Sequence, residues 1–102
     1  MLEIRPNCEL CNCDLPPDSE EARICSYECT FCANCVDGLL DNVCPNCGGG
    51  FVARPIRPAT EYRDVISRNH HPASTQPVHS HYSRAEIELF VNGVKDTPAK
   101  QR

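Results

Sequence analysis

The sequence lacks any long hydrophobic run. No segment approaches the roughly 18 apolar residues that a transmembrane helix needs, and the opening MLEIRPNC has no apolar stretch of signal-peptide length. These absences predict a cytoplasmic protein that has no membrane partner. In such a reducing compartment, closely spaced cysteines persist as thiolates bound to a metal, because disulfides belong mainly to secreted proteins.

Side chains able to form a hydrophobic core are also scarce. The 102 residues include no tryptophan and one methionine, and about thirteen apolar side chains in residues 1–58 could form a core. Chains below roughly 70 to 80 residues rarely fold on hydrophobic burial alone and usually need metal or disulfide links. We therefore expect the first 58 residues to depend on bound metal and to unfold without it.

Basic residues are few in the same part of the chain. Residues 1–58 contain nine Asp/Glu and four Lys/Arg, a balance of −5, whereas residues 59–102 contain five and six, a balance of +1. Thiolate ligands would make the first part more negative still. Because such a module repels phosphate, nucleic-acid binding is disfavoured and a protein is the expected partner.

Cysteine, by contrast, is abundant. The chain has nine, of which eight lie within forty residues. A Cys-x2-Cys turn brings two sulfurs onto one metal and Zn²⁺ accepts four thiolates, so eight cysteines suit two closed tetrahedral sites. Two Zn²⁺ are preferred over iron, an iron–sulfur cluster or disulfides, which an odd number of cysteines fits poorly. The predicted ligands are Cys8, Cys11, Cys25, Cys29, Cys32, Cys35, Cys44 and Cys47.

Spacing alone leaves two ways to divide these ligands. In a serial arrangement, the first four cysteines bind one ion and the last four bind the other. In an interleaved arrangement, zinc site 1 consists of Cys8, Cys11, Cys32 and Cys35, and zinc site 2 consists of Cys25, Cys29, Cys44 and Cys47. In both arrangements the chain passes from one ion to the other near residues 29–32.

One cysteine and four histidines remain outside this set. A two-residue knuckle is a better zinc chelate than a Cys8-x4-Cys13 loop, so Cys13 is expected to be a spare thiol. The histidines lie in the Ser-, Pro- and His-rich segment 69–82, with no fixed carboxylate or cysteine beside them. We expect a solvated segment there rather than a metal site. These residues are His70, His71, His79 and His81.

The local sequence predicts a small metal-stabilised α+β domain at residues 1–58 and a largely irregular, flexible tail at 59–102. Alternation and aromatic content predict a short hairpin over 24–31, helical spacing predicts a short helix over 36–40, and residues 51–56 could close the sheet. In the tail, Ser83 and Glu86 have capping-box spacing, which favours a short helix at 83–94. The competing interpretation is a hairpin about Asn92-Gly93, a dipeptide that favours a primed turn.

Three further features follow the order of a known motif. Phe31 precedes the fifth predicted ligand, Val36 follows the sixth, and Cys44-Pro45-Asn46-Cys47 ends the set. With a helix expected in between, residues 8–47 resemble the RING finger. The resemblance implies a RING-like cross-brace with interleaved pairing of the two zinc sites. Cys29 stands where that family commonly carries His, although all-cysteine variants are known.

A second resemblance covers the chain more widely. The opening MLEIRPNC and the later segments CPNCGG and RPIRP resemble a small bacterial family known only as domain of unknown function 1272. This resemblance supports the metal assignment and supplies no activity.

The same residues argue against catalysis. A catalytic zinc site needs three protein ligands and an open fourth position, which eight cysteines on two ions do not leave. No Ser/His/Asp set is apparent, and Gly48–Gly50 lacks the lysine of a P-loop. We therefore expect neither an enzyme nor a small-molecule substrate.

The expected function is a non-catalytic adaptor that binds another protein. The RING resemblance implies an alternative, a ubiquitin-ligase-like docking protein. The absence of tryptophan, Gly48 after the last ligand and the bacterial source that the second resemblance implies argue against it. A zinc store or sensor is a second alternative, in which Cys13 would assist metal exchange. Ringed by acidic residues, the docking patch of an adaptor or ligase would contain Leu10, Leu39, Leu40 and Pro45.

Overall fold

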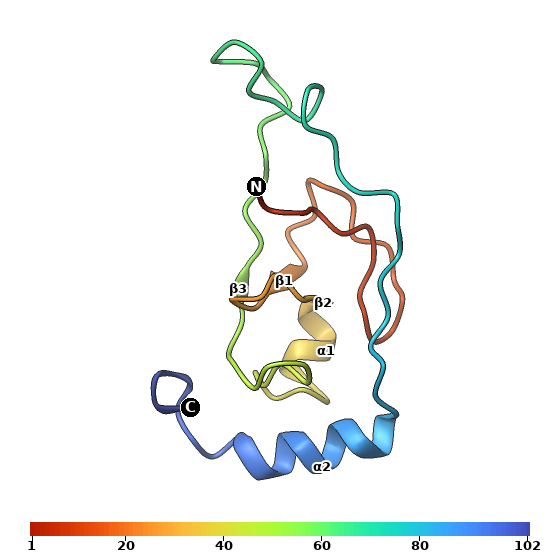
Figure 1. The fold of residues 1–102 in the computed structure, drawn as a ribbon, viewed down its shortest axis with the longest axis vertical. Helices are drawn as coiled ribbons and strands as arrows, with labels where there is room; N and C mark the ends of the chain where they lie inside the picture. The colour runs from red at the N-terminus through yellow and green to blue at the C-terminus, as the bar shows by residue number, and fades with distance from the viewer.

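The computed structural model describes residues 1–102 and contains one antiparallel sheet, two α-helices and a 3-10 turn. The expected α+β fold, with an irregular C-terminal part, is confirmed (Figure 1). The sheet has the strand order β2-β1-β3. Its strands are β1 (Ala22–Ile24), β2 (Thr30–Cys32) and β3 (Val52–Ala53), and the other elements are α1 (Ala33–Asp37), α2 (Arg84–Val94) and η1 (Ala99–Gln101).

The first two strands form the predicted short hairpin. They pair from Ala22 opposite Cys32 to Ile24 opposite Thr30, and the intervening turn contains Glu28 in the left-handed region (φ 67°). Helix α1 follows β2 without a break, so it begins and ends earlier than the helix expected over 36–40. The chain then turns back through residues 41 and 42, both of which have positive φ.

The core contains residues of β1, β2, α1 and α2 together with residues of the loops between them. Five of the thirteen residues in its main cluster are cysteines, so purely hydrocarbon side chains contribute only part of it. Phe31 is fully buried and makes an edge-to-face contact with Phe51, with ring centroids 5.5 Å apart. The other apolar members are Leu15, Ala22, Val36, Leu40, Val43, Ile87 and Val91.

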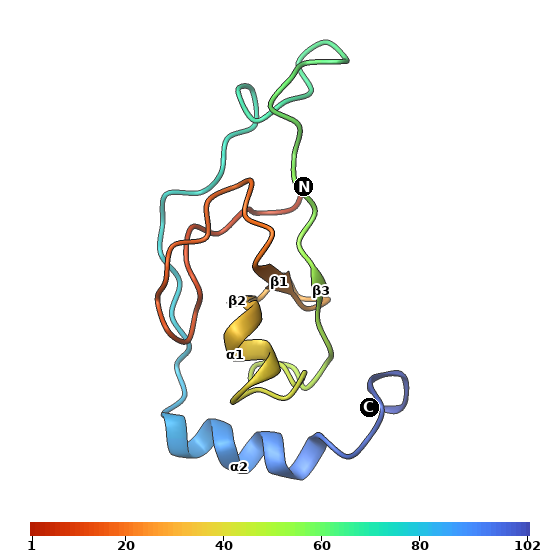
Figure 2. The same ribbon diagram turned by 180° about the vertical axis from the view of Figure 1, so that it is seen from behind.

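Helix α2 lies across one end of the cysteine-rich part, beneath α1 (Figures 1 and 2). The Ser83 hydroxyl accepts a bond from the N–H of Glu86, and the Glu86 carboxylate accepts one from the N–H of Ser83, which completes the capping box. Ile87 and Val91, one turn apart, are 1% and 3% exposed in the core. The dipeptide at 92–93 lies inside this helix, so the competing hairpin interpretation is wrong.

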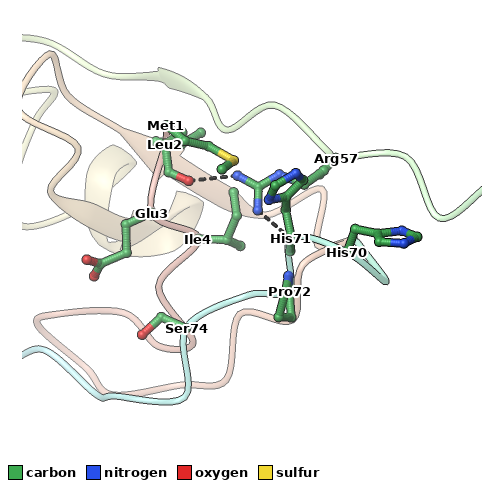
Figure 3. Close-up of a pocket in the computed structure, with 9 residues that line it drawn as sticks. All are labelled: Met1, Leu2, Glu3, Ile4, Arg57, His70, His71, Pro72 and Ser74. Carbon is green, nitrogen blue, oxygen red and sulfur yellow. Dashed lines mark hydrogen bonds between the residues drawn. The ribbon is translucent and has the colours of Figure 1, made fainter. Parts of the chain in front are cut away.

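Residues 59–102 were expected to be a flexible tail with a short helix. The part of this segment that precedes α2 runs back along the N-terminal residues (Figure 1). The guanidinium of Arg57 lies between two carbonyl oxygens and donates to Leu2 at 2.7 Å and to His71 at 2.6 Å (Figure 3). Farther along, the side-chain amide of Asn7 donates to the carbonyl of Val78 and accepts from its N–H. These bonds tie the C-terminal segment to the cysteine-rich domain.

Candidate metal centre

The structure gathers the cysteines into two clusters, each of which could hold a metal ion. In the first, the sulfurs of Cys8, Cys11, Cys13 and Cys32 all lie within 4.8 Å of one another. Four thiolates placed tetrahedrally at about 2.3 Å from Zn²⁺ are separated by about 3.8 Å. The Cys11 and Cys32 sulfurs are 3.7 Å apart, so these donors fit one ion.

The first cluster is shaped by a tight loop over residues 8–13. The N–H of Cys11 points at the Cys8 sulfur at 3.5 Å, and the N–H of Cys8 donates to the carbonyl of Cys13 at 2.9 Å. Asn12 adopts a left-handed conformation (φ 64°), and its side-chain oxygen accepts a bond from Asn7. The loop therefore turns three sulfurs toward Cys32 at the end of β2.

Cys35, the predicted fourth ligand of zinc site 1, lies beside this cluster on α1. Its thiol pKa is raised, first by burial and then by the neighbouring thiols of Cys32, Cys8 and Cys11. Cys13 was expected to be a spare thiol, but its sulfur lies inside the cluster. The spacing argument ranked the Cys8-x4-Cys13 loop below the two-residue knuckle, and it did not foresee that a backbone bond closes the loop and brings the sulfurs of both Cys11 and Cys13 to one site.

Proton affinities in the first cluster are uneven. Burial and the thiols of Cys11 and Cys32 raise the pKa of Cys13 to about 12. At Cys11 burial acts in the same direction, but bonds to its sulfur from the backbone and thiol of Cys13, and from the thiols of Cys8 and Cys32, outweigh it. They lower the pKa of Cys11 to about 7. A metal ion here must displace protons from most of its ligands.

The second cluster brings the sulfurs of Cys25, Cys44 and Cys47 within 4.8 Å of one another. Cys29 adjoins them: burial, followed by the Cys25 thiol, raises the Cys29 pKa, and burial with the charges of Cys29 and Cys25 raises that of Cys44. Backbone N–H groups of residues 27 and 49 point at the sulfurs of Cys25 and Cys47, both at 3.4 Å. Gly48, at φ 80°, allows the last knuckle to turn this way.

A buried carboxylate that spacing did not reveal connects the two clusters. Glu9 is 4% exposed and accepts bonds from the Arg5 guanidinium at 2.8 Å and from the N–H of Thr30. The side-chain amide of Asn46, between two cysteines of the last knuckle, lies 3.5 Å from the same carboxylate. Glu9 thus holds the first loop against β2 and the last knuckle. The only sequence signal for this role of Glu9 was its position between the two predicted ligands Cys8 and Cys11.

The four histidines do not join either cluster. His70 forms a 2.6 Å contact with Glu61 through Nδ1, and both side chains are substantially exposed. His71 lies with Arg57 at a shallow pocket near the amino terminus (Figure 3).

The surface expected for docking is mostly covered. Leu40 is fully buried, and Leu10 and Leu39 are half-buried against the core. Pro45 is buried as well, and it shares a pocket with residues of the segment 82–90, including Phe90 of α2. Residues of α2 therefore lie beside Pro45, where a partner would meet the predicted patch.

No helix in the structure has the length and apolar character needed to cross a lipid bilayer; the longest, α2, has 11 residues.

Comparison with known proteins places this chain in a family. The model described as "Protein of unknown function (DUF1272)" matches residues 1–57. An uncharacterised protein of Rhizobium meliloti (strain 1021) is 54% identical over 78 residues, which cover 76% of this chain and 86% of the relative. No solved structure matches significantly. The cysteine-rich chain therefore belongs to the DUF1272 family of proteins of unknown function.

Proposed function

We propose that the protein binds two Zn²⁺ in a RING-like cross-brace. One observation carries this proposal: Cys32 lies with Cys8 and Cys11, whereas Cys25 lies with Cys44 and Cys47. Serial pairing would instead put Cys25 with the first loop. Thiolate-only ligation favours zinc over harder cations such as Mg²⁺ or Ca²⁺.

The two ions have a structural role in this proposal. All-thiolate ligation closes each coordination shell, which leaves no position for a reactive water. The domain then acts as a rigid, non-catalytic adaptor for another protein. Support comes from the exposed apolar side chains on or beside α2, of which Tyr82 is 47%, Leu89 76% and Phe90 40% exposed. Aromatic and large apolar residues of this kind are typical of interface centres.

Metal content and pairing are tested together. Native mass spectrometry of the reduced protein should give two Zn²⁺ per chain. In the ¹¹³Cd-substituted protein, Cys8→Ser and Cys32→Ser should perturb one NMR resonance, and Cys25→Ser should perturb the other. A single bound ion, an iron chromophore, or a shared effect of Cys8→Ser and Cys25→Ser would contradict the proposal.

The adaptor role is tested by affinity capture from the source cell. Leu89→Asp should abolish capture of a specific partner without changing the zinc content. Glu88→Gln, at the neighbouring exposed position, provides the matched control and should capture normally. Capture that survives Leu89→Asp combined with Phe90→Asp would exclude α2 as the binding surface.

A zinc store or sensor is the second candidate, because the first cluster contains an additional thiol, Cys13. The ligase-like alternative has less support. Its groove would need Leu40 and Pro45 on the surface, and both are buried.

A further inference from the structure

The first metal site has one thiol more than a tetrahedral ion can use. Cys8, Cys11, Cys13 and Cys32 already bring four sulfurs within 4.8 Å of one another. Cys35 completes the Cys32-x2-Cys35 knuckle and packs against the buried cluster that contains Cys8 and Cys32. Five cysteines therefore lie in or beside this site. The second site accounts for the other four cysteines: Cys25, Cys44 and Cys47 form its cluster, and the carbonyl of Cys29 accepts a bond from the N–H of Cys25.

Both competing thiols are held in place by elements that need not unfold. Cys13 is exposed, and its backbone is fixed by the bond from the N–H of Cys8 and by the adjacent bridge between residues 7 and 14. Cys35 is half-buried in α1, and its carbonyl accepts a bond from the N–H of Leu40 at 3.0 Å. A rotation about side-chain bonds is enough to move either sulfur toward or away from the other ligands.

We propose that Cys13 and Cys35 are alternative fourth ligands of the first site, which makes that site exchangeable with external chelators and leaves the second site inert. The proposal rests on the two-zinc function given above. The exchange is not a redox reaction, because the entering thiol loses a proton and the departing thiolate gains one. An external thiol or chelator can enter by the same route while the three other cysteines keep hold of the metal.

Native mass spectrometry gives the first test. The proteins are exposed to a chelator concentration that leaves wild type with two Zn²⁺. Cys13→Ser and Cys35→Ser should each keep two ions, whereas the double variant should lose one. Cys29→Ser, at the site without a spare thiol, is the matched control and should lose one ion as a single change. Loss of an ion in either Cys13→Ser or Cys35→Ser, or retention of two in the double variant, would overturn the proposal.

The second test begins with the metal resonances of wild-type protein, which do not depend on how the variants fold. With ¹¹³Cd in both sites, one metal resonance should correlate with the β-protons of both Cys13 and Cys35, while the other correlates with four cysteines only. Correlation with Cys13 alone or with Cys35 alone would overturn the proposal.

Transfer kinetics give a third test. Transfer of one ion to the chromogenic chelator 4-(2-pyridylazo)resorcinol should be fast in wild type, and the fast phase should disappear in both Cys13→Ser and Cys35→Ser.

The outcomes separate this inference from the proposed function. A wild-type protein that binds fewer than two ions contradicts the two-zinc module itself. A wild-type protein that binds two ions, one of them held by a single fixed set of four cysteines, contradicts only the exchangeable ligand.

Discussion

Removal of the metal should unfold the cysteine-rich domain. Structural zinc contributes about 10 to 16 kcal/mol of apparent binding energy in small finger peptides, and domains are typically stable by only about 5 to 15 kcal/mol in total. The main cluster here contains seven large apolar side chains and five cysteines. Each large apolar side chain contributes about 1.5 to 3 kcal/mol when fully buried. Loss of even one ion therefore removes as much stability as most of the hydrocarbon core provides.

The assay combines far-UV circular dichroism with amide NMR before and after chelation. A reducing agent must be present throughout, because freed thiols would otherwise form disulfides and conceal the effect. We expect dispersed amide resonances to collapse on chelation and to return when Zn²⁺ is added back. Chelator saturated with zinc beforehand is the control. A protein that stays dispersed after complete chelation would refute the argument that metal replaces a hydrophobic core.

Three further outcomes are expected for the zinc-loaded protein. Glu9→Ala should lower the free energy of unfolding in urea by about 2 to 4 kcal/mol, because the buried N–H of Thr30 loses its acceptor and Arg5 keeps only the more exposed Glu3 as a counter-ion; an unchanged midpoint would contradict this. Ser83→Ala should destabilise α2 by about 1 kcal/mol, read from amide hydrogen exchange over residues 84–94. Lowering the pH should release zinc as protons compete for the thiolates, so ion counts by mass spectrometry that stay constant into strong acid would exclude thiolate ligation.

Local sequence signals predicted the elements that depend on neighbouring residues. The hairpin was predicted from the alternation of residues around its turn. The helix over residues 84–94 was predicted from its N-cap, Ser83, whose hydrogen bonds with Glu86 join residues only three positions apart. The spacing of the Cys-x2-Cys pairs likewise predicted sulfur clusters, and the two clusters contain Cys8, Cys11, Cys32, Cys25, Cys44 and Cys47 of the predicted set. Each of these inferences concerns chemistry within a few residues of the chain.

Features that depend on distant contacts were not predictable in the same way. The sulfur of Cys13 lies in the first cluster because the loop is closed by a hydrogen bond from the N–H of Cys8 to the carbonyl of Cys13. The spacing of the cysteines does not predict that this bond forms. Pro45 is buried, and it lines a pocket with Ile87 and Phe90, which follow it by more than forty residues. Apolar residues near a knuckle therefore suggested an open docking patch where the structure has an internal contact.

Helix α2 also couples the C-terminal segment to the second metal site. Ile87 and Val91 are buried in the same cluster as Cys44, and Phe90 lies close to Gly48 in the last knuckle. The guanidinium of Arg102 donates to the carbonyl of Gly48 at 3.2 Å, so the contact extends to the end of the chain.

This coupling must be reciprocal, because a helix that docks better on the metal-bound form also tightens metal binding by the same free energy. Ile87→Ala removes a side chain that is 1% exposed, and such truncations cost about 2 to 5 kcal/mol. Chelator competition should then show weaker zinc binding at the second site, while Leu89→Ala, at a position that is 76% exposed, should leave it unchanged. Equal zinc affinities in wild type and Ile87→Ala would mean that docking of the helix is not coupled to zinc binding at the second site.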